Sequence, residues 1–248
     1  MKRIISSFQY WVFKILINNI EQLVKIFGTI LVLTFSLFIF FMINAPDDYQ
    51  QGSMIKMLYI HVPLSIMSIA IYAIMFLMSI ITMYYGSKIT YLMSISLVKL
   101  EVIFISLSII TGSIWGKATW GTYWIWDARL TSMMILFLFI WSQYMLINSV
   151  KNKFLVQEVF CVITIIGAIN LPIIKFSVYW WNTLHQKSSL LNNSNDMKID
   201  PAFLKPLIYS FSFFTCYALI IFAMELYVNV VNHKALQDKK TKNLKNFI

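Results

Sequence analysis

The chain has 248 residues, of which 59% are hydrophobic and only 12% are charged. A soluble globular domain has about 45–50% apolar and about 25% charged residues. The composition therefore excludes a soluble enzyme, a disordered chain and a nucleic-acid-binding protein, despite the net charge of +10. We expect an all-α integral membrane protein in which most basic residues face the inner side of the membrane.

Six segments are long and apolar enough to cross a membrane, which takes about 20 residues each. They are residues 25–43, 57–85, 89–113, 130–149, 155–176 and 205–231. The segment before them, 1–24, is basic and amphipathic and lacks a small-residue cleavage site. We expect it to be an interfacial anchor rather than a signal peptide. The chain thus divides into this anchor, a six-helix membrane domain over 25–231, and a basic C-terminal tail, 232–248, that lies against anionic lipid.

The distribution of basic residues predicts the orientation. If both termini are cytoplasmic, or on the matrix side of a mitochondrion, 12 of the 20 Lys and Arg residues lie on that side and 7 on the other. This bias follows the positive-inside rule. The outer side then carries three loops, at residues 44–56, 114–129 and 177–204. Within the third loop, the stretch 188–200 is polar and has no fold signal of its own.

The second outer loop is rich in tryptophan. Trp115, Trp120, Trp124 and Trp126 fall within twelve residues, and six of the eight tryptophans lie on this side of the membrane. An aromatic belt would decorate both faces, so the one-sided distribution favours a specific surface. Because Trp120 and Trp124 are four residues apart, we expect them to share one face of a helical turn. An aromatic platform of this kind suits a large planar amphiphile.

Charged residues accompany the tryptophans. Lys117 and Arg129 supply cations for the carboxylates of such a ligand. Asp127 precedes an apolar run, which is typical of a helix N-cap. A capping role alone would explain Asp127 as well as a functional role does.

Two of the three histidines lie at the predicted outer face. His61 opens the second span, two residues before Pro63, which has no N–H and so frees the carbonyl of Tyr59. His185 follows the fifth span. Either histidine alone is more simply interpreted as a packing residue, but imidazole is a common ligand of haem iron, and two of them beside a tryptophan platform indicate a haem site. No C-x-x-C-H sequence is present, so such haem would not be covalently attached.

Three segments resemble the CcmC family, a haem-handling component of the cytochrome c maturation system within the tryptophan-rich haem-handling superfamily. They are YIHVP at Tyr59–Pro63, WGKATWGTYWIWDARLTS from Trp115, and NLPIIKFSVYWWNTLHQ at Asn170–Gln186. The six-span layout is also similar to that family. The resemblance therefore covers most of the chain, apart from the tails and residues 188–200.

The resemblance implies that haem b binds transiently and non-covalently at the outer face, with His61 and His185 as axial ligands of the iron. The loop tryptophans would form the platform, and the two charged residues after them would order it or face the haem propionates. These residues are Trp115, Trp120, Trp124, Trp126, Asp127 and Arg129. The implied partners are a membrane-anchored haem chaperone, the ATPase and permease subunits of an ABC transporter, a small single-span helper and membrane lipid. The implied location is the inner membrane of a bacterium or a mitochondrion.

Two positions depart from the family pattern. Tyr179 stands where many relatives carry an acidic residue before the paired tryptophans, and Met133 stands where bacterial members often have another. Both departures leave the iron ligands intact. They put in doubt any polar contact that those acids would make to the chaperone.

Two other functions remain open from the sequence: a permease or scaffold protein without its own haem site, and a b-type haem protein that exchanges electrons with a quinone. We predict no catalytic residues, because no nucleophile with a base, paired acid and base, or G-x-x-x-x-G-K-[ST] loop occurs. Lys99 and Glu101 lie within the third span, where charge is costly. At i and i+2 they face different sides of the helix and cannot pair with each other. We expect each to pair with another helix or another subunit, and a role in moving haem or protons across the bilayer is the less favoured alternative.

Overall fold

The computed structural model describes residues 2–185 and 201–245, with side chains placed for 19–185 and 202–236. The described helices are α1 (Lys2–Ile43), the short 3-10 helix η1 (Ser53–Met57), α2 (Leu58–Tyr85), α3 (Lys88–Trp120), α4 (Ala128–Ser149), α5 (Lys153–Ala168), α6 (Asn170–Trp180) and α7 (Pro201–Lys245). The predicted all-α fold is confirmed. The polar stretch 188–200 lies outside the described residues.

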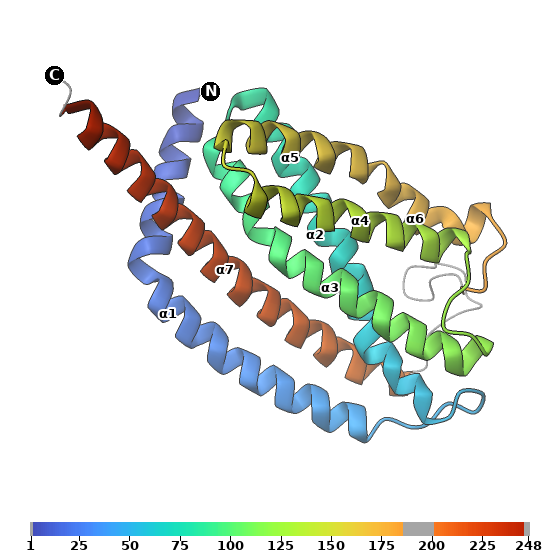
Figure 1. Cartoon of the computed structure of the whole chain (residues 1–248). Coiled ribbons are helices and arrows are strands. Elements are labelled where there is room, and N and C mark those ends of the chain that lie inside the picture. The colour runs from blue at the N-terminus through green and yellow to red at the C-terminus, as the bar shows by residue number, and fades with distance from the viewer. Residues whose placement is uncertain (1, 186–200, 246–248) are drawn as a thin grey trace.

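Six helical segments are long and apolar enough to span a membrane, as predicted. They cover Asn19–Ile43, Ser53–Tyr85, Lys88–Trp120, Ala128–Ser149, Lys153–Trp180 and Ala202–Leu236. The start of α1 and the end of α7 lie at the same end of the bundle as the short connections 86–87 and 150–152 (Figure 1). The tryptophan-rich connection lies at the opposite end. Which side of the membrane each end faces stays a prediction.

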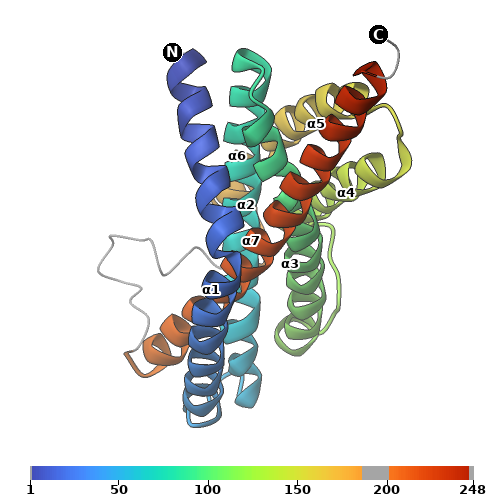
Figure 2. The same cartoon turned by 90° about the vertical axis from the view of Figure 1, so that its left-hand side faces the viewer.

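The core of the bundle is formed by α2, α3, α4 and the α5–α6 pair. Helix α7 packs against α2 and α3, and α1 packs chiefly against α7 on the outside (Figure 2). Helix α1 runs without a break from Lys2 to Ile43, so the predicted anchor and the first span form one helix. Its exposed apolar side chains, such as Val32 and Phe40, form a surface suited to lipid. The interfacial role of residues 1–24 stays a prediction.

Pro63 lies in the second turn of α2, where it removes one helical hydrogen bond. The carbonyl of Tyr59, freed as predicted, accepts a hydrogen bond from the Ser210 hydroxyl on α7. This contact matters because no water is available in a bilayer core to satisfy a free carbonyl. It holds the N-terminal end of α2, which carries His61, against α7.

The fifth predicted span is divided into two helices that meet at Ile169. Pro172 has no N–H, so the carbonyl of Ala168 four residues earlier loses its helical donor and the helix kinks. Just after the junction, the side-chain amide of Asn170 donates to the carbonyl of Ser132 on α4 at 2.6 Å. The sequence interpretation missed this kink. It directs α6 along α4, which brings the segment after α6 to the tryptophan-rich end.

Helix α3 continues to Trp120, seven residues beyond its predicted end, and stops at Gly121. Gly121 has a φ of 77°, a left-handed conformation that favours glycine, and its N–H donates to the carbonyl of Lys117. The connection between α3 and α4 is therefore only residues 121–127. The predicted helical turn shared by Trp120 and Trp124 is wrong, because the helix ends between them.

Candidate functional site

His61 and His185 line one cavity at the tryptophan-rich end of the bundle. His61 comes from the first turn of α2, and His185 comes from the irregular segment 181–185 after α6. Three other predicted site residues line the same cavity: Trp120, Trp124 and Arg129. The structure thus brings together five of the eight residues singled out from the sequence, from widely separated parts of the chain.

The His61 ring is oriented by α3. Its Nδ1 lies 3.0 Å from the carbonyl oxygen of Ser108, and because a carbonyl only accepts, Nδ1 is the nitrogen that carries the hydrogen. The other nitrogen, Nε2, then keeps its lone pair, with the Ser65 hydroxyl 3.4 Å away. A metal-binding histidine is usually held in this way, through a hydrogen bond at the nitrogen that does not bind the metal.

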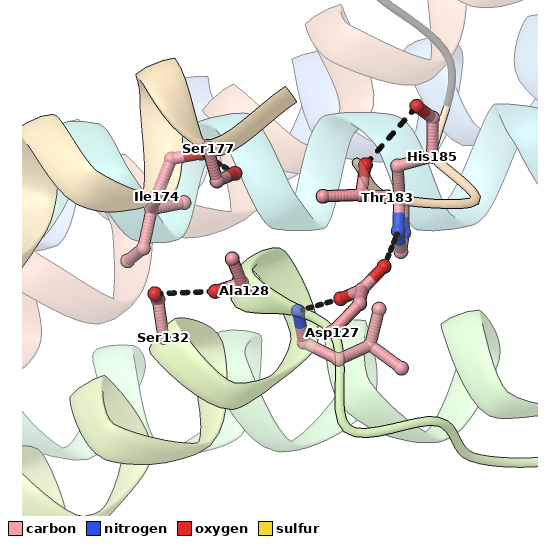
Figure 3. A network of polar contacts seen from close by, with 8 residues as sticks. Asp127, Ala128, Ser132, Ile174, Ser177, Thr183 and His185 are labelled. Atoms are coloured by element: carbon pink, nitrogen blue, oxygen red, sulfur yellow. Dashed lines mark hydrogen bonds and ion pairs between the residues drawn. The ribbon is translucent and has the colours of Figure 1, made fainter. Parts of the chain in front are cut away.

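His185 is held in the same manner by a different group. Its Nδ1 lies 3.4 Å from Oδ2 of Asp127 (Figure 3). A carboxylate only accepts, so Nδ1 donates and Nε2 keeps its lone pair. Burial lowers the pKa of His185 below its usual range, and the nearby Arg129 guanidinium lowers that pKa further, while Asp127 opposes both. The ring is therefore neutral at neutral pH, which is the form that binds iron.

Asp127 also has the capping role predicted for it. Its Oδ1 accepts from the backbone N–H of Leu130 at 2.8 Å, at the start of α4 (Figure 3). From the sequence, Asp127 could be either a helix cap or a residue of the functional site. One carboxylate does both, with one oxygen on the helix and the other on His185.

Each histidine also has one tryptophan ring at its edge. The Trp115 and His61 rings meet at 5.8 Å between centroids with an interplanar angle of 70°, and Trp120 and His185 meet at 4.8 Å and 67°. Trp115 is itself held by a hydrogen bond from its Nε1 to Oε1 of Gln51, at 2.8 Å, in the connection between α1 and α2. The two tryptophans on α3 therefore position the two imidazoles.

The remaining predicted residues lie beside the cavity rather than in its wall. Trp126 is 77% exposed and contacts the Trp124 ring edge-on. Together with Asp127 it lines a separate open hollow bounded by residues 182–184. Of the two departures from the family pattern, Met133 lines the cavity and Tyr179 is half exposed at the surface.

Several residues that shape the site were missed from the sequence. Ser65, Ser108 and Gly112 line the cavity around His61, and Gln51 holds Trp115. A Cβ at Gly112 would lie 2.7 Å from Cε1 of His61, so only glycine leaves room for the ring. Ser65 lies one helical turn after His61, a spacing that could have indicated it. The others lie on different segments, where no sequence pattern points to them.

The wall of the cavity has the chemistry that a haem group requires. Two neutral imidazoles supply ligands for iron, Arg129 supplies a cation, and the buried Nε1 of Trp124 has no hydrogen-bond partner within the described part of the chain. The cavity measures about 70 Å³, far below the roughly 300 Å³ or more of pockets that hold small-molecule ligands and cofactors. The walls fit haem in their chemistry and must separate to admit it.

Comparison with known proteins agrees with this chemistry. The family model of CcmC, heme exporter protein C, matches residues 9–241. This chain belongs to the CcmC family. Within the family, heme exporter protein C of Bradyrhizobium diazoefficiens is 42% identical over 164 residues, which is 66% of this chain and 62% of that protein. Heme exporter protein C of Escherichia coli K12 is 40% identical over 166 residues, 67% of this chain and 66% of that protein.

Mitochondrial relatives are similar as well. A ccmC-like mitochondrial protein of Marchantia polymorpha, named for cytochrome c biosynthesis, is 38% identical over 181 residues, 73% of this chain and 76% of that protein. The part of this chain that aligns with the two bacterial relatives above covers slightly less than two thirds of the length of each. The family and the six membrane-spanning helices together make this chain an integral membrane protein of the CcmC type.

Proposed function

We propose that this CcmC chain binds haem b between His61 and His185 at the outer face of the membrane, transiently and without a covalent bond. The observation that carries the proposal is that both imidazoles line one cavity, and each is held at Nδ1 so that Nε2 keeps its lone pair. Arg129 would face the haem carboxylates. The indole of Trp124 offers a hydrogen-bond donor to the same ligand.

The two ligands differ in how firmly they are held, which suits a carrier that must release its cargo. His61 lies in a helix and is fixed by Ser108 at 3.0 Å. His185 lies in a segment without regular structure and has a longer contact, 3.4 Å, to Asp127. We propose that haem enters and leaves by displacement of the His185 side of the cavity, while His61 stays in place.

Bound haem would pass to a membrane-anchored haem chaperone for cytochrome c maturation. The chain would work with the ATPase and permease subunits of an ABC transporter and with a small single-span helper, in the inner membrane of a bacterium or a mitochondrion. Both termini would lie on the cytoplasmic or matrix side. The family names of the relatives support this role. The chain itself would bind and hand over haem without catalysing a reaction.

Delivery is tested by following the chaperone in cells that express the complete maturation system. Haem covalently attached to the chaperone is measured by haem staining after denaturing electrophoresis. We expect His61→Ala and His185→Ala each to abolish the stained chaperone, and His233→Ala to leave it unchanged, because His233 lies at the opposite end of the bundle. Full loading of the chaperone with both cavity histidines replaced would exclude this function.

A further inference from the structure

A polar patch interrupts the lipid-facing surface between α3 and α7, far from the haem cavity. Its surface members are Lys99, Glu225 and Asn229, and Asn229 is bonded to the buried Ser96. The Lys99 ammonium lies 2.8 and 3.0 Å from the two carboxylate oxygens of Glu225. One helical turn away, the Asn229 amide donates to the Ser96 hydroxyl at 2.9 Å. The predicted pairing of Lys99 with another helix is confirmed, and its partner is α7.

The ion pair is not enclosed by this chain. The Lys99 side chain is 54% exposed and that of Glu225 is 24% exposed. By contrast Glu101, two residues along α3, is fully buried and accepts from Ser68. Lys99 therefore belongs to the outer face of α3, and the Glu225 carboxylate draws its ammonium sideways toward α7.

The surroundings of the patch are those of a helix in lipid. Ile103 and Leu107, one and two turns from Lys99 along α3, are 40% exposed, and Met224 and Val228 on α7 are exposed as well. Lys99 is eleven residues from the start of α3, about 16 Å along the helix axis at 1.5 Å per residue. Helix α3 has 33 residues and is therefore about 50 Å long, whereas the hydrocarbon core is about 30 Å thick. A core centred on α3 begins about 10 Å from its start and so contains the ion pair.

Such a pair is incompletely satisfied in lipid. An ammonium has three N–H donors, and within the described residues its hydrogen bonds go only to Glu225. Lipid tails offer no acceptor, and a charged group at the middle of a bilayer is costly. A neighbouring protein helix with an acceptor at this depth would complete the bonding and remove both side chains from lipid.

We propose that the polar patch is the seat of a membrane-spanning helix from a different chain, which presents a carboxylate or amide oxygen to Lys99. Polar side chains commonly join helices within membranes in this way. The partner presents an acceptor because the Lys99 ammonium is the more exposed member of the pair, 54% against 24% for Glu225, and it keeps a donor to spare. The proposal rests on the proposed function only for the choice of partner chains to test.

The test is site-specific photo-cross-linking in cells that co-express the tagged transporter permease and the tagged single-span chain. A photoreactive benzoylphenylalanine replaces Ile103 beside the patch or, as a control, Leu138 on α4, which is also apolar and is more exposed, 57% against 40%. We expect the probe at Ile103, and not the probe at Leu138, to yield a product that carries one of the two tags. In the Lys99→Met background the yield should fall about tenfold, the effect of losing a charged hydrogen bond.

Lys99→Met leaves Glu225 without its partner and could unfold the bundle, so the exchanged pair Lys99→Glu with Glu225→Lys is tested beside it. This variant keeps an ion pair between α3 and α7 but moves the ammonium. We expect a folded protein with normal haem content and a low cross-link yield. Products with lipid alone or with a second copy of this chain, or a yield that neither variant lowers, would overturn the proposal. A wild type that forms the cross-link but contains no haem would count against the proposed function and leave this proposal standing.

Discussion

Asp127 connects a helix start to a histidine through its two carboxylate oxygens. Oδ1 receives the N–H of Leu130 at 2.8 Å, and Oδ2 lies 3.4 Å from Nδ1 of His185. The N-cap residue of α4 therefore also determines which ring nitrogen of His185 keeps its lone pair. Helix capping and ligand orientation are thus linked, because a shift in the first turn of α4 moves the group that orients His185.

Asp127→Asn separates the two roles. Asn caps helices as well as Asp does, but it removes the negative charge that raises the pKa of His185. We therefore expect the pKa of His185 to fall further below its usual range, with α4 intact. Titration of ring-labelled histidine by NMR measures this pKa. An unchanged or higher His185 pKa in Asp127→Asn would show that the carboxylate does not act on the ring. Asp127→Ala, which loses the cap as well, should cost about 1 kcal/mol of stability.

The lowered pKa of His185 also predicts how stability depends on pH. The unfolded chain takes up a proton on this residue below pH about 6.5, whereas the folded chain resists protonation to lower pH because its pKa is depressed. Since the unfolded state then binds more protons, the His185 contribution to the free energy of unfolding decreases as pH falls through that range. Thermal unfolding in detergent between pH 7.5 and about 5 measures this pH dependence of stability. His185→Gln should make the stability depend less on pH.

Gly112→Ala tests the space around His61. The new Cβ would lie 2.7 Å from Cε1 of a ring that Ser108 holds in place. Because the ring must turn or α3 must move, we expect haem affinity to fall by about tenfold, as for an overpacked site. Haem titration of the purified protein measures the affinity. Gly28→Ala is the control, because a Cβ at that position meets nothing within 4 Å. Equal affinity in the two variants would mean that His61 has no fixed position.

Gln51→Leu tests whether the connection between α1 and α2 supports the site. It removes the acceptor for Nε1 of Trp115, whose ring lies at the edge of His61. A lost hydrogen bond of about 1 kcal/mol predicts about fivefold faster dissociation of haem. Stopped-flow transfer of haem to an apo-myoglobin acceptor measures this rate. The control is the neighbouring Gln50→Leu, which among the described residues loses a side-chain contact with exposed Tyr49 and should release haem at the wild-type rate. A wild-type rate in Gln51→Leu would contradict the prediction.

Ser210→Ala removes the donor for the Tyr59 carbonyl that Pro63 leaves free. We expect a loss of about 1 kcal/mol in stability, because Pro63 leaves this carbonyl without its usual helical donor. Thermal unfolding in detergent is the measurement. Ser212→Ala is a matched control, since among the described residues its hydroxyl bonds only to the carbonyl of Ile208 in its own helix. Equal unfolding temperatures for the two variants would show that the α2–α7 bond contributes nothing.

Sequence periodicity and composition were sufficient for the six spans, because each span is a long apolar run and lipid leaves the backbone few alternatives to a helix. Local features were also predictable from the sequence, since Pro63 indicates a carbonyl without its helical donor and Asp127 indicates a helix N-cap. The residues that bond to these two groups could not be predicted from the sequence. Ser210 lies 151 residues from Tyr59, and no local pattern connects them. The kink at Ile169 was missed even though Pro172 is visible in the sequence, because the surrounding apolar run is long enough for one straight span.

The candidate site was predictable in its residue types and less so in its geometry. His61 and His185 were selected by their scarcity and their shared face. That they line one cavity depends on the kink before α6 and on the close packing of α3 against α2 at Gly112. Trp120 and Trp124 lie on different segments because α3 ends at Gly121, between them. A spacing of four residues predicts a shared face only where the helix continues.

The most direct measurement is the haem content of the detergent-purified protein by pyridine haemochrome, together with its absorption spectrum. The wild type, co-produced with the haem chaperone, is compared with His61→Ala, His185→Ala and the control His233→Ala. We expect haem with a bis-histidine spectrum in the wild type and in His233→Ala, and lost haem or a shifted Soret band in each cavity variant. A wild type without haem, or cavity variants with unaltered haem and spectrum, would contradict haem binding between His61 and His185.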